Sequence, residues 1–161
     1  MVLDLAPLAL DSRARRQIGN FPRLEQNPAQ LRIKLQVHQN DHPAATLRSA
    51  TGVYNCFGLA FGSRRTWILE DEVRKVLADD GYRQIGLGDL REGDLVIYST
   101  RPGGIDHAAV VTAFDLTDPS VAWVISQWGQ DGEWKHRIDD VPGFFGRPTE
   151  FWTDRRLLSG T

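Results

Sequence analysis

The chain has 161 residues, which is enough for one domain with its own hydrophobic core. Hydrophobic residues make up 41% and charged residues 25%, and 19 basic side chains stand against 21 acidic ones. This near balance excludes the strong field by which proteins bind nucleic acids or anionic membranes, so we expect neither partner. The single cysteine excludes an internal disulfide and fits a reducing compartment.

Targeting signals are not evident in the sequence. The segment Met1–Asp11 is apolar, but it lacks a basic start and contains Asp4 and Pro7, so we do not interpret it as a signal peptide. No apolar run approaches the roughly 20 residues that span a bilayer. We therefore expect a cytoplasmic protein, or one exported by a secretion system that needs no signal peptide.

The first fifty residues contain one periodic stretch. Apolar and polar residues alternate over 31–37, and this period of two predicts a half-buried strand. The polar run 38–43 that follows predicts a loop. Its two histidines, His38 and His42, are spaced like metal ligands on a helix, but the Asn, Asp and Pro around them favour a solvated turn.

The only cysteine lies at the predicted start of a helix. Phe57, Ala60 and Phe61 recur at i, i+3 and i+4, and Asn55 is a good N-cap, so Cys56 takes the first helical position. Unpaired N–H groups and the helix dipole favour the thiolate there. We therefore expect the pKa of Cys56 to fall from about 8.5 into the range of roughly 3.5–7.5.

The rest of the chain predicts one more helix and then strands. Leu69, Val73, Val76 and Leu77 form an apolar stripe that ends before Gly81. The predicted strands cover residues 82–85, 94–99, 107–113, 121–126, 134–138 and 150–152. Helices that precede a run of strands indicate the α+β class with an antiparallel sheet.

A cysteine hydrolase needs a base beside its thiol, and His107 is the best candidate. It opens an apolar strand directly after the flexible run 101–104, so it can be both well positioned and reachable. His136 is a reserve candidate, but its charged neighbours Glu133, Lys135 and Arg137 indicate an exposed, solvated strand.

Three blocks in order carry a family resemblance: Asn55–Ala60 on a helix, Leu90–Tyr98 with its Gly-Asp pair, and Asp106–Val111. This order resembles the papain-like amidohydrolases, and among them the NlpC-type cell-wall peptidases and CHAP amidases. The resemblance covers roughly residues 50–128, and the segments 124–136 and 143–148 are similar to bacterial domains on the same fold. It implies a papain-like α+β domain over 50–161, with a catalytic helix packed on an antiparallel sheet. Residues 1–49 are then an N-terminal extension of helix and strand, either separate or part of the same domain.

The resemblance also implies roles for single residues. Cys56 becomes the nucleophile and His107 the base, and the third catalytic residue falls at Gln127, or at Ser126 in its place. These two neighbours point to opposite faces of a strand, so only one of them can fill the role. Support for the oxyanion is expected from the start of the helix, with Asn55 and Tyr54 as the flanking residues.

The implied reaction is amide hydrolysis by a peptidase or amidase through a Cys-acyl intermediate, without metal or cofactor. The expected substrate is a peptide or amide, either a peptidoglycan stem peptide or a protein, and a toxin effector would add a delivery or immunity protein as partner. One alternative is a deamidase or transglutaminase-like acyltransferase. The other is a non-catalytic binding module on the same fold, because Phe57 departs from the Asp-Cys-Ser-Gly motif of the cell-wall enzymes.

Overall fold

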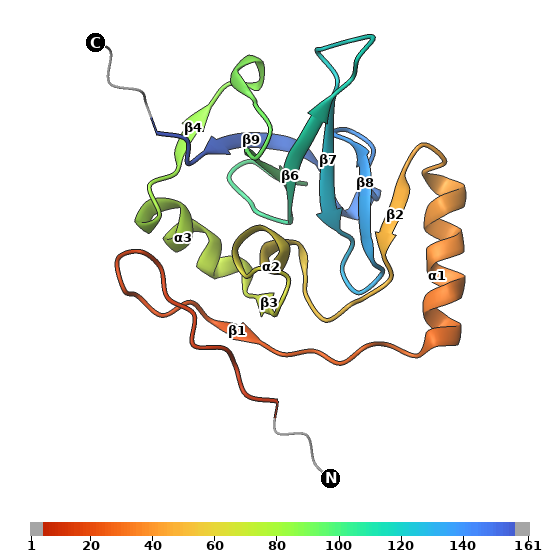
Figure 1. Ribbon diagram of the computed structural model, residues 1–161, viewed down its shortest axis with the longest axis horizontal. Coiled ribbons are helices and arrows are strands. Elements are labelled where there is room, and N and C mark those ends of the chain that lie inside the picture. Colours follow the sequence, from red (N-terminus) through yellow and green to blue (C-terminus); the bar gives the residue numbers. More distant parts are fainter. Residues whose placement is uncertain (1–4, 157–161) are drawn as a thin grey trace.

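The computed structural model describes residues 5–156 and is built on one large antiparallel sheet (Figure 1). In spatial order the sheet contains β2 (Thr46–Ser49), β8 (Glu133–Arg137), β7 (Ala122–Gln127), β6 (His107–Phe114), β5 (Leu95–Ser99), β9 (Arg147–Thr153) and β4 (Arg83–Ile85). A small antiparallel sheet pairs β1 (Asn20–Phe21) with β3 (Trp67–Ile68). The helices are α1 (Pro28–Asp41), α2 (Cys56–Phe61) and α3 (Val73–Asp79), with 3₁₀ helices at Glu70–Glu72, Leu87–Asp89 and Gly143–Phe145. This mixed architecture is compatible with the expected α+β class.

The predicted elements after residue 55 are present, with small shifts at their ends. The strands predicted after residue 81 are β4 to β9, and α2 begins at Cys56 as expected. The helix lies close to the chain beside it, where Gly58 approaches the carbonyl oxygen of Thr66. A Cβ atom at Gly58 would stand 1.8 Å from that oxygen, so only glycine allows this contact. Helix α2 packs on β3, β6 and β7.

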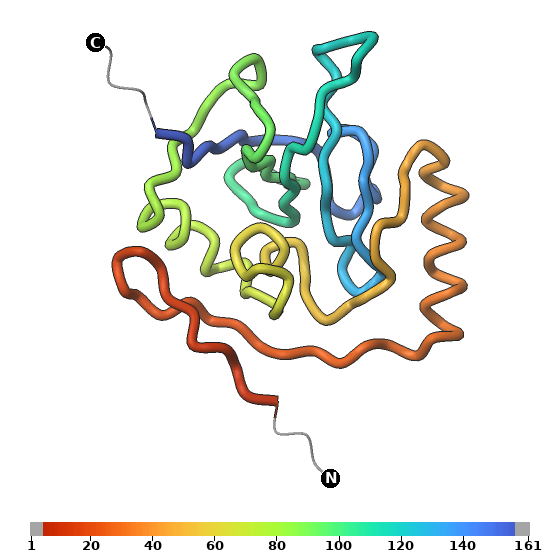
Figure 2. The backbone as a smooth tube through the Cα atoms, viewed as in Figure 1, coloured from red at the N-terminus to blue at the C-terminus, as the bar shows by residue number. Residues whose placement is uncertain are grey.

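The strand predicted over 31–37 is wrong, because this stretch belongs to α1. Asn27 caps the helix by accepting hydrogen bonds from the N–H groups of Ala29 and Gln30, and Pro28 occupies the first turn. The chain runs from β1 along the outside of the molecule to reach α1 (Figure 2). The loop predicted at 38–43 is wrong for the same reason, since His38 lies in α1 and His42 is its C-cap.

The large sheet carries a different core on each face. The face toward α2, named here the helix face, contributes Leu95, Ile97 and Ala108, which pack against Cys56, Phe57, Val73, Val76 and Leu77. The opposite face, named here the tryptophan face, contributes Val96, Tyr98, Ala109, Val111 and Val124, which pack with Trp128, Trp134 and Phe145. Since successive side chains of a strand point to opposite faces, the start of β6 contributes residues to both cores.

Candidate functional site

Cys56 occupies the first position of α2, and Asn55 fixes that position. The Asn55 Oδ1 atom accepts hydrogen bonds from the N–H groups of Gly58 at 2.8 Å and Ile68 at 3.1 Å. Its Nδ2 atom donates to the carbonyl oxygen of Ile68 at 2.8 Å. Asn55 therefore caps α2, as expected, and ties the helix to β3.

The thiol of Cys56 is buried on the helix face. Only 6% of the residue is exposed, although the backbone N–H groups of Ala108 and Phe57 point toward the sulfur and favour the thiolate. Burial outweighs these groups and raises the pKa of Cys56 to about 12. The predicted lowering of this pKa is therefore wrong, because a helix start favours the thiolate only where solvent or a counter-charge supports it.

His107 lies on the other face of the sheet. It pairs with Tyr98 of β5, and their rings meet edge to face with centroids 5.3 Å apart. Phe145 stacks on the imidazole with centroids 3.8 Å and planes 16° apart. Both contacts belong to the core of the tryptophan face, whereas Cys56 packs with Ala108, the next residue of β6. The sheet therefore separates the predicted nucleophile from the predicted base.

The neighbours Ser126 and Gln127 point to opposite faces, as predicted. Gln127 is on the helix face with Cys56, and its Nε2 atom donates to the carbonyl oxygen of Thr51 at 2.7 Å. Ser126 is on the tryptophan face with His107, and its hydroxyl is within 2.6 Å of the Nε2 atom of His136. The structure thus groups Cys56 with Gln127 and His107 with Ser126, so neither choice of third residue completes a triad.

The predicted catalytic histidine and glutamine hold unused hydrogen-bonding atoms. Among the described residues, the buried side-chain nitrogen and oxygen atoms without a partner are both ring nitrogens of His107 and Oε1 of Gln127. Buried polar groups are nearly always hydrogen-bonded, and leaving one unpaired costs about 1–3 kcal/mol. His107 and Gln127 belong to neighbouring strands, since Gln127 ends β7 beside the start of β6, where His107 lies.

Tyr54 lies on the helix face, but its hydroxyl is already in use. It donates to Oε1 of Glu133 at 2.8 Å, and burial together with this carboxylate raises the pKa of Tyr54 to about 12. The hydroxyl is therefore not free to support an oxyanion, contrary to its expected role.

His136 is fully buried, so its prediction as an exposed residue is wrong. Its Nδ1 atom is 2.7 Å from the carbonyl oxygen of Arg137, which can only accept, so we assign the ring proton to Nδ1. Nε2 then accepts from Ser126, whose oxygen in turn accepts from Trp128 at 2.9 Å. The signal that could have revealed this burial is the alternation of β8, which places His136 on the same face as Trp134.

Comparison of the chain with protein-family models, curated proteins and solved structures found no match. Within residues 5–156, no helix is both long and apolar enough to cross a membrane. The same residues contain no cluster of three or more His, Cys, Asp or Glu side chains arranged to hold a metal ion.

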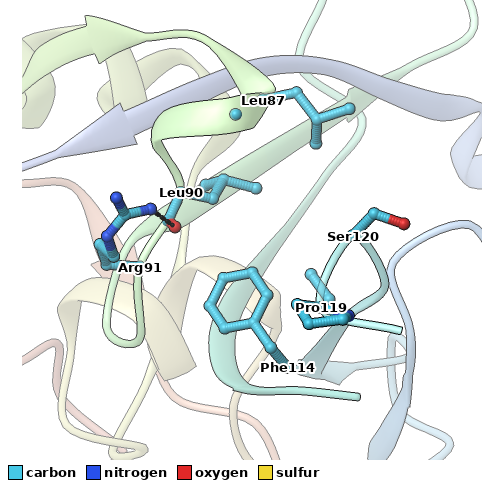
Figure 3. A pocket seen from close by; sticks show the side chains of 8 residues that line it. Leu87, Leu90, Arg91, Phe114, Pro119 and Ser120 are labelled. Atoms are coloured by element: carbon cyan, nitrogen blue, oxygen red, sulfur yellow. Dashed lines mark hydrogen bonds between the residues drawn. The ribbon is translucent and has the colours of Figure 1, made fainter. Parts of the chain in front are cut away.

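A hollow of about 610 Å³ lies between the 3₁₀ helix Leu87–Asp89 and the hairpin that joins β6 to β7. Figure 3 shows the side chains of Leu87, Leu90, Phe114 and Pro119 around a shared space, with Arg91 at its side. The Arg91 guanidinium folds back and donates through Nη1 to the carbonyl oxygen of Leu90 at 2.7 Å. This volume is within the range of small-molecule sites, roughly 300–1,000 Å³. No motif in the sequence indicates this hollow, because the residues that line it come from separate turns.

The buried histidines make the stability of the fold depend on pH. Burial lowers the pKa of His107 well below its usual value and that of His136 from 6.5 to about 4. In this pH range the two imidazoles bind protons in the unfolded chain but stay neutral in the folded one. The free energy of unfolding should therefore fall as the pH drops from about 6.5 to about 4. His136 alone should contribute about 3 kcal/mol to this loss. Urea denaturation at several pH values measures it, and a flat profile across this window would contradict the burial of both rings in neutral form.

Proposed function

We propose that this chain is a non-catalytic binding module, and that its ligand is a small amphipathic molecule held in the hollow beside Leu87. The hollow itself carries the proposal, because an apolar cavity with few polar groups is the usual form of a ligand site. A papain-like fold is part of this proposal. It is supported by the order of the Cys56 helix, β5 and β6, in a version whose cysteine and histidine do not face each other.

The lining indicates the chemistry of the ligand. Leu87, Leu90 and Phe114 offer apolar surface, and each Å² of apolar area that a ligand covers there contributes about 25 cal/mol. Arg91 supplies a positive group at the side of the hollow. A molecule with an apolar body and an anionic end therefore fits both features.

The fluorescent probe 8-anilinonaphthalene-1-sulfonate has this chemistry and tests the proposal. Leu87→Asp places a carboxylate in the hollow and should weaken binding of the probe about tenfold or more, through lost apolar contact and charge repulsion. Leu24→Asp is the matched control, since the two leucines are 57% and 60% exposed and Leu24 does not line the hollow. Fluorescence titration of the folded chain gives the affinities. Equal binding by the two variants, or no saturable binding by the unaltered chain, would refute the proposal.

A cysteine-dependent amide hydrolase is the second candidate, and one observation favours it. His107, which precedes Ala108 in β6, and Gln127 of the neighbouring strand β7 both keep unused polar atoms. The Ala108 N–H points at the Cys56 sulfur. In this proposal the first residue of β6 turns over, so that the imidazole reaches the helix face and takes the proton of the thiol. The thiolate then attacks the carbonyl carbon of a peptide amide, and the C–N bond breaks as the imidazolium returns its proton to the leaving amine. Water or a second amine then releases the acyl group from Cys56. The reactivity of Cys56 separates the two candidates.

A further inference from the structure

Two arginines converge on one buried carboxylate on the helix face. Glu133 is 3% exposed, and Arg64 reaches its Oε1 atom through Nε at 2.7 Å. Arg48 approaches the Oε2 atom through its own Nε at 3.3 Å. Both arginine side chains remain about half exposed, at 46% for Arg48 and 49% for Arg64. Together with the Tyr54 hydroxyl, they surround the carboxylate.

The charges in this cluster do not balance. One carboxylate faces two guanidinium groups, so one positive charge is left over in a chain whose net charge is −2. Within the described part of the chain, the Nη atoms of Arg48 and the Nη1 atom of Arg64 make no hydrogen bond. Donors of both guanidiniums thus remain available at a half-exposed surface.

The need to neutralise Glu133 does not explain the second arginine. Asp94 is buried to a similar degree, at 1% exposed, and one arginine is enough for it. Arg155 donates to Asp94 through Nε at 3.0 Å and Nη2 at 2.8 Å. The Thr153 hydroxyl and the Arg91 backbone N–H add neutral hydrogen bonds at 2.6 Å and 2.8 Å. At Glu133, Arg64 already supplies the one positive charge that Asp94 receives from Arg155, so the charge of Arg48 is additional.

The backbone is irregular at both arginines. Leu47 and Ser49 pair with consecutive residues of β8, so Arg48 is the extra residue of a β-bulge, a device that redirects a side chain. Ser63 and Arg64 have φ angles of +52° and +61°, which are uncommon for residues other than glycine. The β-bulge at Arg48 and the positive φ angle of Arg64 therefore occur at the two residues whose side chains meet at Glu133.

We propose that Arg48 and Arg64 form a binding site for an oxyanion, the carboxylate or phosphate group of a small ligand. Guanidinium groups donate pairs of parallel hydrogen bonds to such groups, and Glu133 holds the two side by side before the ligand arrives. The site is separate from the hollow beside Leu87, whose lining residues it does not share.

Calorimetric titration of the full chain with inorganic phosphate and with glutarate tests this site at low ionic strength. Saturable binding is expected, weakening as salt is added. Arg48→Gln should reduce the affinity about tenfold, since it removes charge-assisted hydrogen bonds while Arg64 and Tyr54 still satisfy Glu133. Arg48→Lys should lose less affinity, because lysine keeps the positive charge although it lacks the paired donors of the guanidinium group.

Arg155→Gln is the matched control, because it removes an arginine from a buried carboxylate elsewhere. It should lower the melting temperature and leave the affinity unchanged. Binding of phosphate alone or glutarate alone would identify the ligand group. The site would be refuted if neither anion binds, if Arg48→Gln binds like the unaltered chain, or if Arg155→Gln loses as much affinity. Leu87→Asp should bind both anions normally, so failure here is distinct from failure of the hollow.

Discussion

Replacing His107 by phenylalanine should stabilise the fold by about 1–3 kcal/mol. Both ring nitrogens of His107 are fully buried without a hydrogen-bond partner, so the native residue carries a desolvation cost that phenylalanine does not. The stack on Phe145 and the edge contact with Tyr98 suit either ring. Urea denaturation at neutral pH measures the change, and His107→Leu separates the effect of polarity from that of ring size.

His136→Phe is the matched control for His107→Phe. The two histidines are equally buried, but both nitrogens of His136 are hydrogen-bonded, one to Arg137 and one to Ser126. Its replacement leaves those partners unsatisfied and should cost about 1–3 kcal/mol, opposite in sign to the first variant. Equal destabilisation by both variants would show that the His107 ring also has a partner in solution.

If His107→Phe stabilises the fold, the result would indicate that His107 has a role other than packing. A residue that costs folding energy and is still present is better explained by a function than by packing. His107 would then remain a candidate for the base of the hydrolase, reached only when β6 rearranges. A loss of stability would instead leave the binding module as the simpler account.

Cys56 should react with iodoacetamide on the order of a thousandfold more slowly than an exposed thiol near neutral pH. With its pKa raised to about 12 by burial, the thiolate fraction is smaller by roughly that factor than for a free cysteine of pKa about 8.5. Because only the thiolate reacts, the rate should climb with pH and show no plateau below about pH 10. Mass spectrometry of the alkylated chain against pH gives this profile.

His107→Ala and unfolding by urea are the controls for the Cys56 rate. The sheet lies between the two residues, so His107→Ala should leave the rate nearly unchanged, while urea should restore the rate of a free cysteine. Fast alkylation with a plateau below pH 8.5 or so, lost in His107→Ala, would overturn this separation. It would establish the Cys-His pair and favour the hydrolase over the binding module.

The elements that hold the candidate residues could be predicted because their signals are local. Asn55 caps the helix through atoms three residues apart, and β6 shows its apolar character within one short run. The same kind of signal was available for α1, whose Asn27-Pro28 start was outweighed by an alternation of apolar residues. In the helix, Leu35 packs against the core while Ile33 and Val37 remain exposed.

Alternation along a strand determined by itself that Ser126 and Gln127 point to opposite faces, and likewise His107 and Ala108. It could not determine which face α2 covers, because that depends on contacts between residues far apart in the chain. The tertiary structure placed α2 on the face of Ala108, where Cys56 lies against that small side chain, and left His107 beneath Phe145. The convergence of Arg48 and Arg64 on Glu133 is decided in the same way, since three separate segments meet there. A sequence carries the side chains of a site, but only packing brings them to the same side of the sheet.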